Sequence, residues 1–290
     1  MTVKMNSQQT GTVRLGALLL GSWLLSSCAA VQAQTDQTVV NGGLWSVPVT
    51  AEVLTQAAQG NPLRYQDRPV WVGLVNNQPT AMIGIGLSDI GSQQLVNNRG
   101  ELIAATTVRE RAYAEQHLKL TQTQYVTPNT EQNARFEREA AEQKAAYRVY
   151  SRQTAAQWPA FQWPLHGRVS SEFGLRRFFN GEPRAPHLGI DIAGKQGTPV
   201  LAPAEGTVAL IGDYFFNGRT VIIDHGQGLF SMLCHFSDIQ VKVGQPLTQR
   251  TVVGLVGATG RATAPHLHWT VSLNDSRINP AILLPAQKKN

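Results

Sequence analysis

Cysteine and charge are both scarce in this chain of 290 residues. Cys28 and Cys234 are its only two cysteines, so a modified or removed Cys28 leaves Cys234 without an intrachain partner and the fold without a disulfide. Charged residues make up 15% of the sequence and form no run of one sign, which argues against a nucleic-acid partner. The net charge of +6 suits work near an anionic surface and equally suits an ordinary soluble protein.

Long hydrophobic runs are also few, and the informative one lies near the N-terminus. Basic residues precede the run Leu15–Leu25, which is too short to span a bilayer, so we predict an export signal over residues 1–27. The following "LSSC" resembles a bacterial lipobox, which would make Cys28 a lipid-bearing first residue. Cleavage after "VQA" is the alternative and would release a soluble protein. We expect an exported protein of the periplasm or cell envelope, anchored to a membrane through Cys28.

Composition divides the rest of the chain into segments. After a polar connector, residues 28–42, the short apolar runs of residues 43–125 alternate with turn residues and predict a small β-sandwich-like domain. A stretch at 129–150 has neither glycine nor proline and predicts a helix, within a helical linker at 126–160. Residues 161–286 carry dense glycine and proline between β-branched runs, which indicates short antiparallel strands. We therefore predict a mainly β protein.

Two short motifs in the C-terminal half carry candidate metal ligands. In "PHLGIDIA", His187 and Asp191 would stand about 13 Å apart on a straight strand, too far to share a metal. The backbone must therefore bend, and Gly189 between them makes a bend possible. In "APHLHWT", His266 and His268 point to the same face of a strand, which suits one imidazole on a metal and one handling a proton.

A third segment, "LFSMLCH", adds His235 to this group. A catalytic zinc needs three protein ligands, and hydrolysis needs one or two further imidazoles, so five candidates suffice for both tasks. Cys234 beside it is expected on the opposite face of the strand, as a buried apolar residue and not a nucleophile. His117, His166 and His225 are interpreted as structural or surface histidines.

These segments resemble the lysostaphin-like, or LytM-type, zinc metalloendopeptidases, which cut peptide cross-links in bacterial cell walls. The resemblance covers roughly Trp163 to Leu284 and rests on "SSEFGLRRFFNGEPRAPHLGIDIA", "GTPVLAPAEGTV", "VIIDHGQGL" and "GATGRATAPHLHW". The upstream β region is similar to the N-terminal domain of some exported members. The resemblance implies an antiparallel β-sheet zinc peptidase domain over residues 161–286.

The resemblance also assigns roles to the candidate residues. It implies that His187, Asp191 and His268 bind Zn²⁺, and that His235 and His266 are the catalytic imidazoles. One of these two would act as general base and the other would stabilise the oxyanion or leaving group, with the choice between them open.

One departure from the family concerns the neighbours of His235. Family members often have tyrosine two positions before this histidine and leucine after it, where this chain has Leu233 and Phe236. The missing hydroxyl puts the positioning of the substrate in doubt. The metal ligands and both catalytic imidazoles that the resemblance implies are present.

We therefore expect a zinc-dependent endopeptidase that hydrolyses peptide cross-links of peptidoglycan, with the D-alanyl-diaminopimelate bond favoured over a glycine bridge. One alternative is a non-catalytic envelope module that binds peptidoglycan or activates another wall hydrolase. Another is a peptidase that acts on a different exported peptide. We expect the N-terminal domain to cover the cleft, and the alternative is that it positions the enzyme. The sequence does not indicate an oligomeric state.

Overall fold

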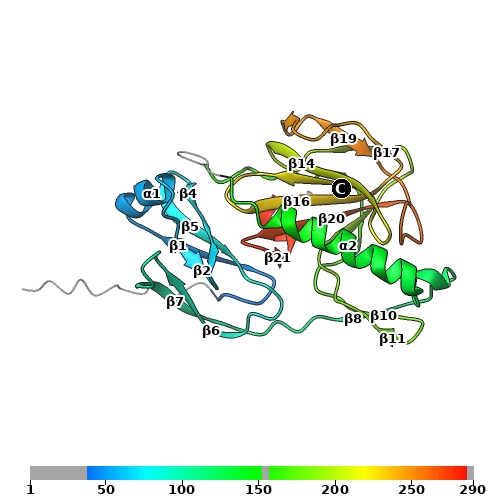
Figure 1. The fold of residues 1–290 in the computed structure, drawn as a ribbon, viewed down its shortest axis with the longest axis horizontal. Helices are drawn as coiled ribbons and strands as arrows, with labels where there is room; N and C mark the ends of the chain where they lie inside the picture. The colour runs from blue at the N-terminus through cyan, green and yellow to red at the C-terminus, as the bar shows by residue number, and fades with distance from the viewer. Residues whose placement is uncertain (1–37, 152–156, 286–290) are drawn as a thin grey trace, which may run out of the picture. The chain divides into compact units, whose positions relative to one another are not determined.

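A computed structural model describes residues 38–151 and 157–285, which all fall within one compact unit (Figure 1). The fold is mainly β, which confirms the prediction. The predicted export signal, residues 1–27, and the lipid attachment residue Cys28 lie outside the described residues. Neither of the α-helices in the described ranges is long and apolar enough to cross a membrane.

The N-terminal region forms two small antiparallel sheets, ordered β1-β5-β4 and β3-β2-β6-β7. Trp45 and Ile83 of the first sheet share a hydrophobic core with Tyr65 and Leu95 of the second. A short helix that the sequence analysis did not predict begins after Thr50, whose hydroxyl accepts a hydrogen bond from the Val53 amide. The elements here are β1 (Leu44–Pro48), α1 (Ala51–Ala58), β2 (Arg64–Tyr65), β3 (Arg68–Pro69), β4 (Trp71–Val75), β5 (Gln78–Gly84), β6 (Gly91–Val96) and β7 (Leu102–Val108).

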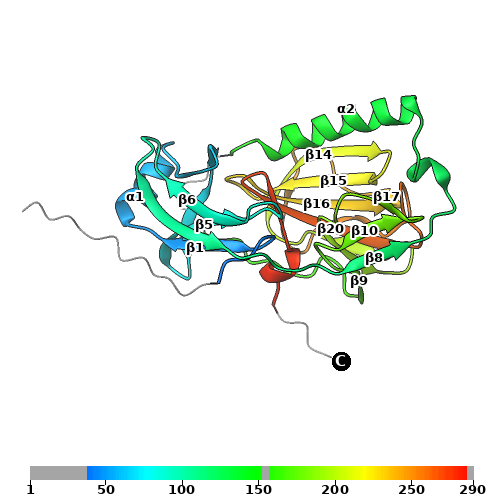
Figure 2. The same cartoon turned by 90° about the horizontal axis from the view of Figure 1, so that it is seen from below.

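The predicted linking helix is present as α2 (Thr130–Tyr147), after β8 (Glu115–Leu118) and the 3₁₀ turn η1 (Thr123–Tyr125). Asn129 and Gln132 form a reciprocal capping box, which satisfies backbone N–H groups at the start of the helix. At its other end, Tyr147 is buried against Ile222 and Phe230 of the C-terminal sheet. The helix therefore lies on one face of that sheet (Figure 2).

The C-terminal region is built on an eight-stranded sheet ordered β18-β14-β15-β16-β20-β12-β9, with β21 also paired to β20. A smaller sheet, β13-β19-β17, accompanies it, and the 3₁₀ turn η2 (Pro280–Leu283) follows. The strands are β9 (Val169–Ser171), β10 (Arg176–Phe179), β11 (Glu182–Pro183), β12 (Ile190–Ala193), β13 (Pro199–Leu201), β14 (Gly206–Tyr214), β15 (Gly218–Asp224), β16 (Leu229–Phe236), β17 (Asp238–Ile239), β18 (Pro246–Leu247), β19 (Val252–Leu255), β20 (His266–Leu273) and β21 (Ser276–Ile278).

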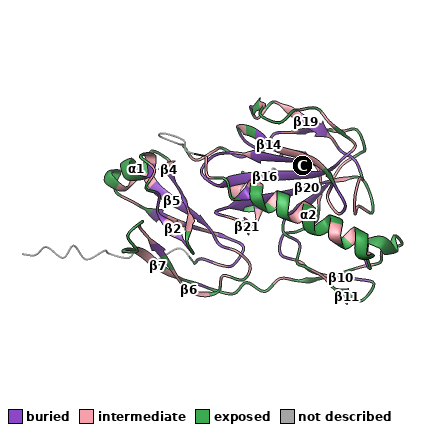
Figure 3. Ribbon diagram, viewed as in Figure 1, coloured by how far each residue is buried: buried purple, intermediate pink, exposed green. Residues whose placement is uncertain are grey.

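The two faces of this sheet are covered by different side chains. On one face Leu233 and Trp269 join the main core together with Val200 and Val253 of the smaller sheet. On the other face, residues of β16 that alternate with these pack against α2. Both sides of β16 and of most of β20 are therefore buried, as the purple colour of these strands shows in Figure 3.

Two side-chain amides connect the N-terminal sheets to the C-terminal sheet. Gln227 accepts a hydrogen bond from the Val72 amide (3.0 Å) and donates one to its carbonyl (3.1 Å). Asn274 bonds the Gly84 backbone in the same reciprocal way, at 2.6 and 3.0 Å. In addition, β8 pairs in parallel with β10, so residues 115–118 extend a C-terminal sheet. The domain limits drawn from the sequence stay predictions.

Candidate metal centre and cleft

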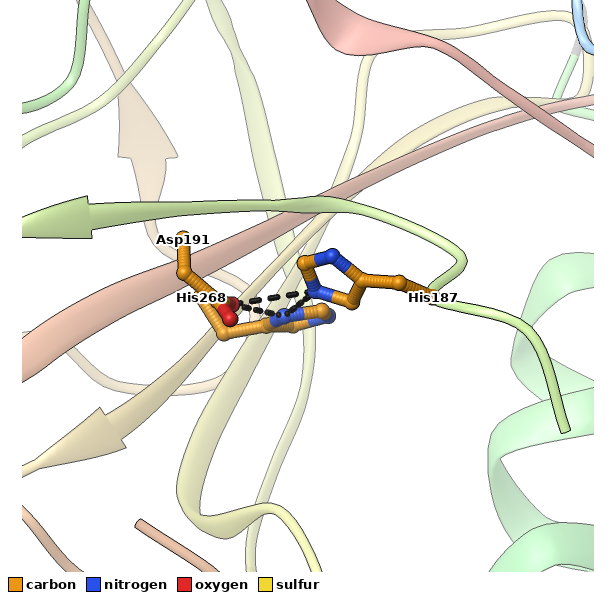
Figure 4. A group of neighbouring side chains, drawn as sticks. All are labelled: His187, Asp191 and His268. Carbon is orange, nitrogen blue, oxygen red and sulfur yellow. Dashed lines mark hydrogen bonds and ion pairs between the residues drawn. The ribbon is translucent and has the colours of Figure 1, made fainter. Parts of the chain in front are cut away.

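Three of the predicted residues converge on one point (Figure 4). His187 lies in the loop before β12, Asp191 is on β12, and His268 is opposite Asp191 on β20. Oδ1 of Asp191 is 3.0 Å from Nε2 of His187 and 2.8 Å from Nδ1 of His268, and those two nitrogens are 3.0 Å apart. One carboxylate oxygen and two imidazole nitrogens thus form a group that could hold a metal ion.

The proton positions on these rings also fit a cation. Nδ1 of His187 is 2.7 Å from the Glu172 carbonyl oxygen, which can only accept, so this nitrogen carries the proton. Burial lowers the pKa of His187 to about 4, which keeps the ring neutral and leaves Nε2 a bare lone pair. That lone pair faces the carboxylate oxygen of Asp191, an arrangement that repels unless a cation lies between them.

The outer nitrogen of His268 is also engaged, because Nε2 lies 2.9 Å from the Thr270 hydroxyl. When Nε2 donates to this oxygen, Nδ1 is free to bind a metal. Three lone pairs, from two imidazoles and one carboxylate, are a ligand set typical of zinc hydrolases. The residues present therefore fit a divalent metal.

Arg177 of β10 fixes the second oxygen of Asp191, and the sequence analysis gave it no role. Its Nη2 donates to Oδ2 of Asp191 at 2.9 Å and to the Ser171 hydroxyl at 3.1 Å, while Nε donates to Gln116. The positive charge of Arg177 stabilises the ionised form of this carboxylate. Asp191 is thus an anion whose Oδ1 remains available to a metal.

Gly189 allows the approach of β12 to β20, although not in the way the sequence analysis expected. Its φ angle lies outside the left-handed range, so the bend needs no glycine-specific backbone conformation. A Cβ here would instead lie 2.5 Å from the Trp269 carbonyl oxygen and 2.8 Å from Cε1 of His268. Glycine is therefore required by close contact with the metal-ligand candidate on the next strand.

We expect Gly189→Ala to weaken metal binding roughly ten- to hundredfold, because the added methyl group displaces the His268 ring. The loss of a hydrogen bond that orients a ligand weakens metal affinity by about the same factor. Competition with a chelator measures this affinity. Gly86→Ala is the control, because its Cβ would meet only the flexible Asp89 side chain, at 3.2 Å. Unchanged metal affinity in Gly189→Ala would contradict the requirement for glycine, because it would show that the strands can move apart to accept the methyl group.

His235 reaches the cleft through an irregularity in β16. Alternation would place His235 on the same face as Leu233, in the main core. However, the pairing of β15 with β16 shifts register at this point, and the φ angle of His235 is +66°, which is uncommon for a residue other than glycine. The left-handed backbone turns the imidazole to the face that carries His268, and such strain is frequent at functional sites.

His235 and His266 lie together beside the metal-ligand candidates. Their ring centroids are 4.7 Å apart, and that of His235 is 6.0 Å from that of His268. Nδ1 of His235 donates to the Thr259 carbonyl and Nδ1 of His266 to the Ala264 carbonyl, both at 2.8 Å. With Nδ1 as the donor, Nε2 of each ring carries a lone pair when the ring is neutral. Burial, together with its two histidine neighbours, lowers the pKa of His235 to about 3.

All five predicted residues line one cleft of about 300 Å³. Its floor is the α2 side of the sheet, and Tyr147 of α2, Phe216 of the β14–β15 turn and Arg261 contribute to its walls. In its neutral form this group of side chains can bind a cation and accept protons, which is the chemistry of metal-assisted hydrolysis.

Cys234 does not take part in this site. It is buried and free, and it packs with Met232 and Phe230 against α2, as a small apolar residue would. Burial raises the pKa of its thiol to about 12, which keeps it protonated. Cys234 is therefore a buried apolar residue, as predicted. Its expected position on the strand face opposite the site is wrong, because its side chain lies on the α2 face together with His268.

The remaining histidines lie outside the metal-ligand group, as predicted. His117 is exposed and stacks on Phe178, and His166 is exposed in a loop. His225 is buried, with Nδ1 donating to the Glu205 carbonyl (2.6 Å) and Nε2 2.8 Å from the Ser231 hydroxyl. It supports the turn between β15 and β16.

His225 should make the folded protein sensitive to acid, because burial lowers its pKa from 6.5 to about 4. Between these values the unfolded chain takes up a proton that the folded chain does not, so stability falls as the pH falls. Above pH 6.5 the effect vanishes, and at pH 4 it reaches roughly 3 kcal/mol. Urea unfolding at several pH values should show a steeper loss for the wild type than for His225→Gln, and equal slopes would contradict the assignment.

Comparison with known proteins places these residues in a family. Residues 185–280, which include all five cleft residues named above, match the family model described as Peptidase family M23. A crystal structure from Pseudomonas aeruginosa assigned to peptidase M23 is 40% identical, covering 86% of this chain and 95% of that chain with a TM-score of 0.66.

Curated relatives match over the C-terminal region. The peptidoglycan DD-endopeptidase ShyA of Vibrio cholerae is 38% identical over 113 residues, 39% of this chain and 26% of ShyA. The DD-carboxypeptidase/endopeptidase Mpg of Neisseria gonorrhoeae is 37% identical over 122 residues, 42% of this chain and 28% of Mpg. The chain thus spans only a minor part of these relatives. Its family match and its likeness to nearly the whole Pseudomonas chain show that it belongs to peptidase family M23.

Proposed function

We propose that this chain is a zinc-dependent endopeptidase that hydrolyses peptide cross-links of peptidoglycan. The observation that carries the proposal is the convergence of His187, Asp191 and His268 on one point, with the bare nitrogens of His235 and His266 beside it. A structural metal site would use its ligands to close the coordination shell, whereas here two further imidazoles line the open cleft. The names of the relatives ShyA and Mpg support peptidoglycan as the substrate class.

In this proposal His187, Asp191 and His268 hold the zinc through Nε2, Oδ1 and Nδ1. When bound, zinc supplies Lewis acidity, which polarises a carbonyl and lowers the pKa of water. Glu172 and Thr270 orient the two liganding rings, and Arg177 holds the carboxylate of Asp191 in place.

His235 and His266 handle the proton. One of the two bare Nε2 atoms accepts the proton that the attacking water loses, and the imidazolium then gives a proton to the leaving amine nitrogen. The carbonyl oxygens of Thr259 and Ala264 hold the rings in the tautomer that this transfer needs. The two rings lie side by side, so either one can accept the first proton. The proposal therefore assigns the proton transfers to the two histidines together.

We also propose that the protein is exported and lipid-anchored at Cys28. Mass spectrometry of the mature N-terminus should find a lipid on Cys28. A mature chain that starts after Ala33 would contradict the lipid anchor and would indicate a soluble exported protein.

Digestion of purified cross-linked muropeptides, followed by mass spectrometry, tests the activity. Zinc-loaded protein should release monomers, and protein treated with a chelator should not. If fully loaded protein leaves the cross-links intact but binds the muropeptides, the chain is a binding module of the envelope. If it cuts exported proteins and not isolated sacculi, the substrate class is wrong and the hydrolytic chemistry stands.

A further inference from the structure

Arg261 occupies a position in the cleft that the proposed mechanism does not use. It lies on the loop between β19 and β20, and its amide donates to the Phe216 carbonyl at 2.9 Å. The same loop supplies the Thr259 and Ala264 carbonyls that hold the rings of His235 and His266. The Arg261 side chain lines the same cleft as both rings. Its guanidinium is thus attached to the backbone segment that positions the proton-transferring groups.

Two aromatic rings hold this guanidinium. Its Cζ lies 4.8 Å from the ring centroid of Phe179, on β10, and 4.6 Å from that of Phe216. Contacts of this kind stabilise the cation and restrict its rotation, but they use the flat faces and not the N–H groups. The edge of the guanidinium, with its N–H donors, remains available for an in-plane partner.

No protein group within residues 38–151 and 157–285 supplies that partner through a side-chain hydrogen bond or an ion pair with Arg261. The two neighbouring guanidiniums differ in this respect. Arg177 is paired with Asp191, and Arg184 donates to the Val126 and Pro183 carbonyls. Burial and the charges of these two arginines lower the pKa of Arg261 to about 10, so it is still a cation at neutral pH.

The Arg261 side chain is only partly exposed and lines the cleft, and its donors have no side-chain partner among the described residues, so a ligand of opposite charge would satisfy them. A guanidinium edge matches a carboxylate, which it binds through two parallel hydrogen bonds. In the proposed reaction, the loop that carries Arg261 also holds the imidazoles that return a proton to the leaving amine. A carboxylate bound by Arg261 therefore belongs on the amine side of the scissile amide.

We propose that Arg261 binds a free carboxylate on the amine side of the scissile amide and thereby selects cross-links whose leaving amine belongs to an amino acid with its own free carboxylate. This inference rests on the proposed peptidase function and specifies its substrate. A cross-link between the carbonyl of one stem peptide and a diamino acid centre that keeps its carboxylate meets the requirement. A glycine bridge, whose next residue is linked onward through its own carbonyl, does not.

Two cross-linked muropeptide dimers test this assignment, one with the acceptor carboxylate free and one with it amidated. The wild type should cut the free acid with a kcat/KM about ten- to a hundredfold higher, as expected for a charge-assisted pair. Arg261→Gln should lose this preference through KM and cut the amidated dimer at the wild-type rate. Arg261→Lys, which keeps the charge without the bidentate edge, should keep part of the preference.

Arg184→Gln is the matched control, because it removes a nearby positive charge that does not line the cleft, and it should retain the full preference. A wild type without preference, or an Arg261→Gln variant that slows both dimers equally, would overturn the assignment. If zinc-loaded wild type cuts neither dimer, the proposed peptidase function fails. Equilibrium binding then decides the role of Arg261: preferential binding of the free acid that Arg261→Gln abolishes supports it, and equal binding overturns it.

Discussion

Alanine at His235 or at His266 is expected to reduce kcat/KM by roughly 10²–10⁴-fold while zinc stays bound, because each removes a proton-transferring group without removing a ligand. His266→Ala tests the assignment more stringently, because Nε2 of His266 lies only 3.8 Å from Oδ1 of Asp191, a proposed metal ligand. Muropeptide digestion measures the rate, and elemental analysis of the same samples measures the zinc content.

His166→Ala is the control for both variants, because His166 is exposed and lies outside the cleft, so its rate should equal that of the wild type. Loss of zinc from His266→Ala would mean that this ring is a ligand, and the division of the histidines into two ligands and two catalytic groups would be wrong. Full activity of His235→Ala would remove that ring from the mechanism.

In contrast, alanine at His268 or Asp191 should remove the metal. Zinc affinity should be at least about a hundredfold weaker, and cleavage should be lost together with the metal. Changes to groups that only support a ligand already weaken binding 10–100-fold, so removal of a ligand must cost more. Asp191→Ala also leaves Arg177 without its carboxylate partner, so its thermal unfolding should be compared with that of Arg177→Gln. Competition against a chelator measures the affinity.

Addition of excess zinc would show whether a variant has lost activity because its metal site is weakened or because a metal ligand is missing. Excess zinc should restore part of the activity of Arg177→Gln, in which the three ligands remain, and should not restore that of His268→Ala. Wild-type zinc affinity in either ligand variant would show that the metal binds elsewhere.

Much of the site could be predicted because its spacing is local. His266 and His268 are two residues apart on one strand, and strand alternation places both on the same face. The meeting of Asp191 with His268 depends on strand pairing between β12 and β20, which no local pattern specifies. The chemistry of the residue types suggested a shared metal before the pairing was known, and the resemblance to a peptidase family supplied the individual roles.

Other features could not be predicted, for identifiable physical reasons. Alternation along β16 would direct His235 into the core, and only the register shift and its left-handed backbone turn it into the cleft. The roles of Arg177 and Arg261 depend on which partners their guanidiniums meet, and arginine is too common in sequences for spacing to reveal that. The parallel pairing of β8 with β10 leaves no trace in either segment alone.

The most direct test of the metal centre is anomalous diffraction at the zinc edge from crystals of the zinc-loaded protein. The proposal predicts one zinc at about 2.0–2.2 Å from Nε2 of His187, Oδ1 of Asp191 and Nδ1 of His268, with the remaining position open to solvent. The rings of His235 and His266 should lie beside the metal without coordinating it. A zinc bound by either of these two rings, or found outside the cleft, would contradict the proposal.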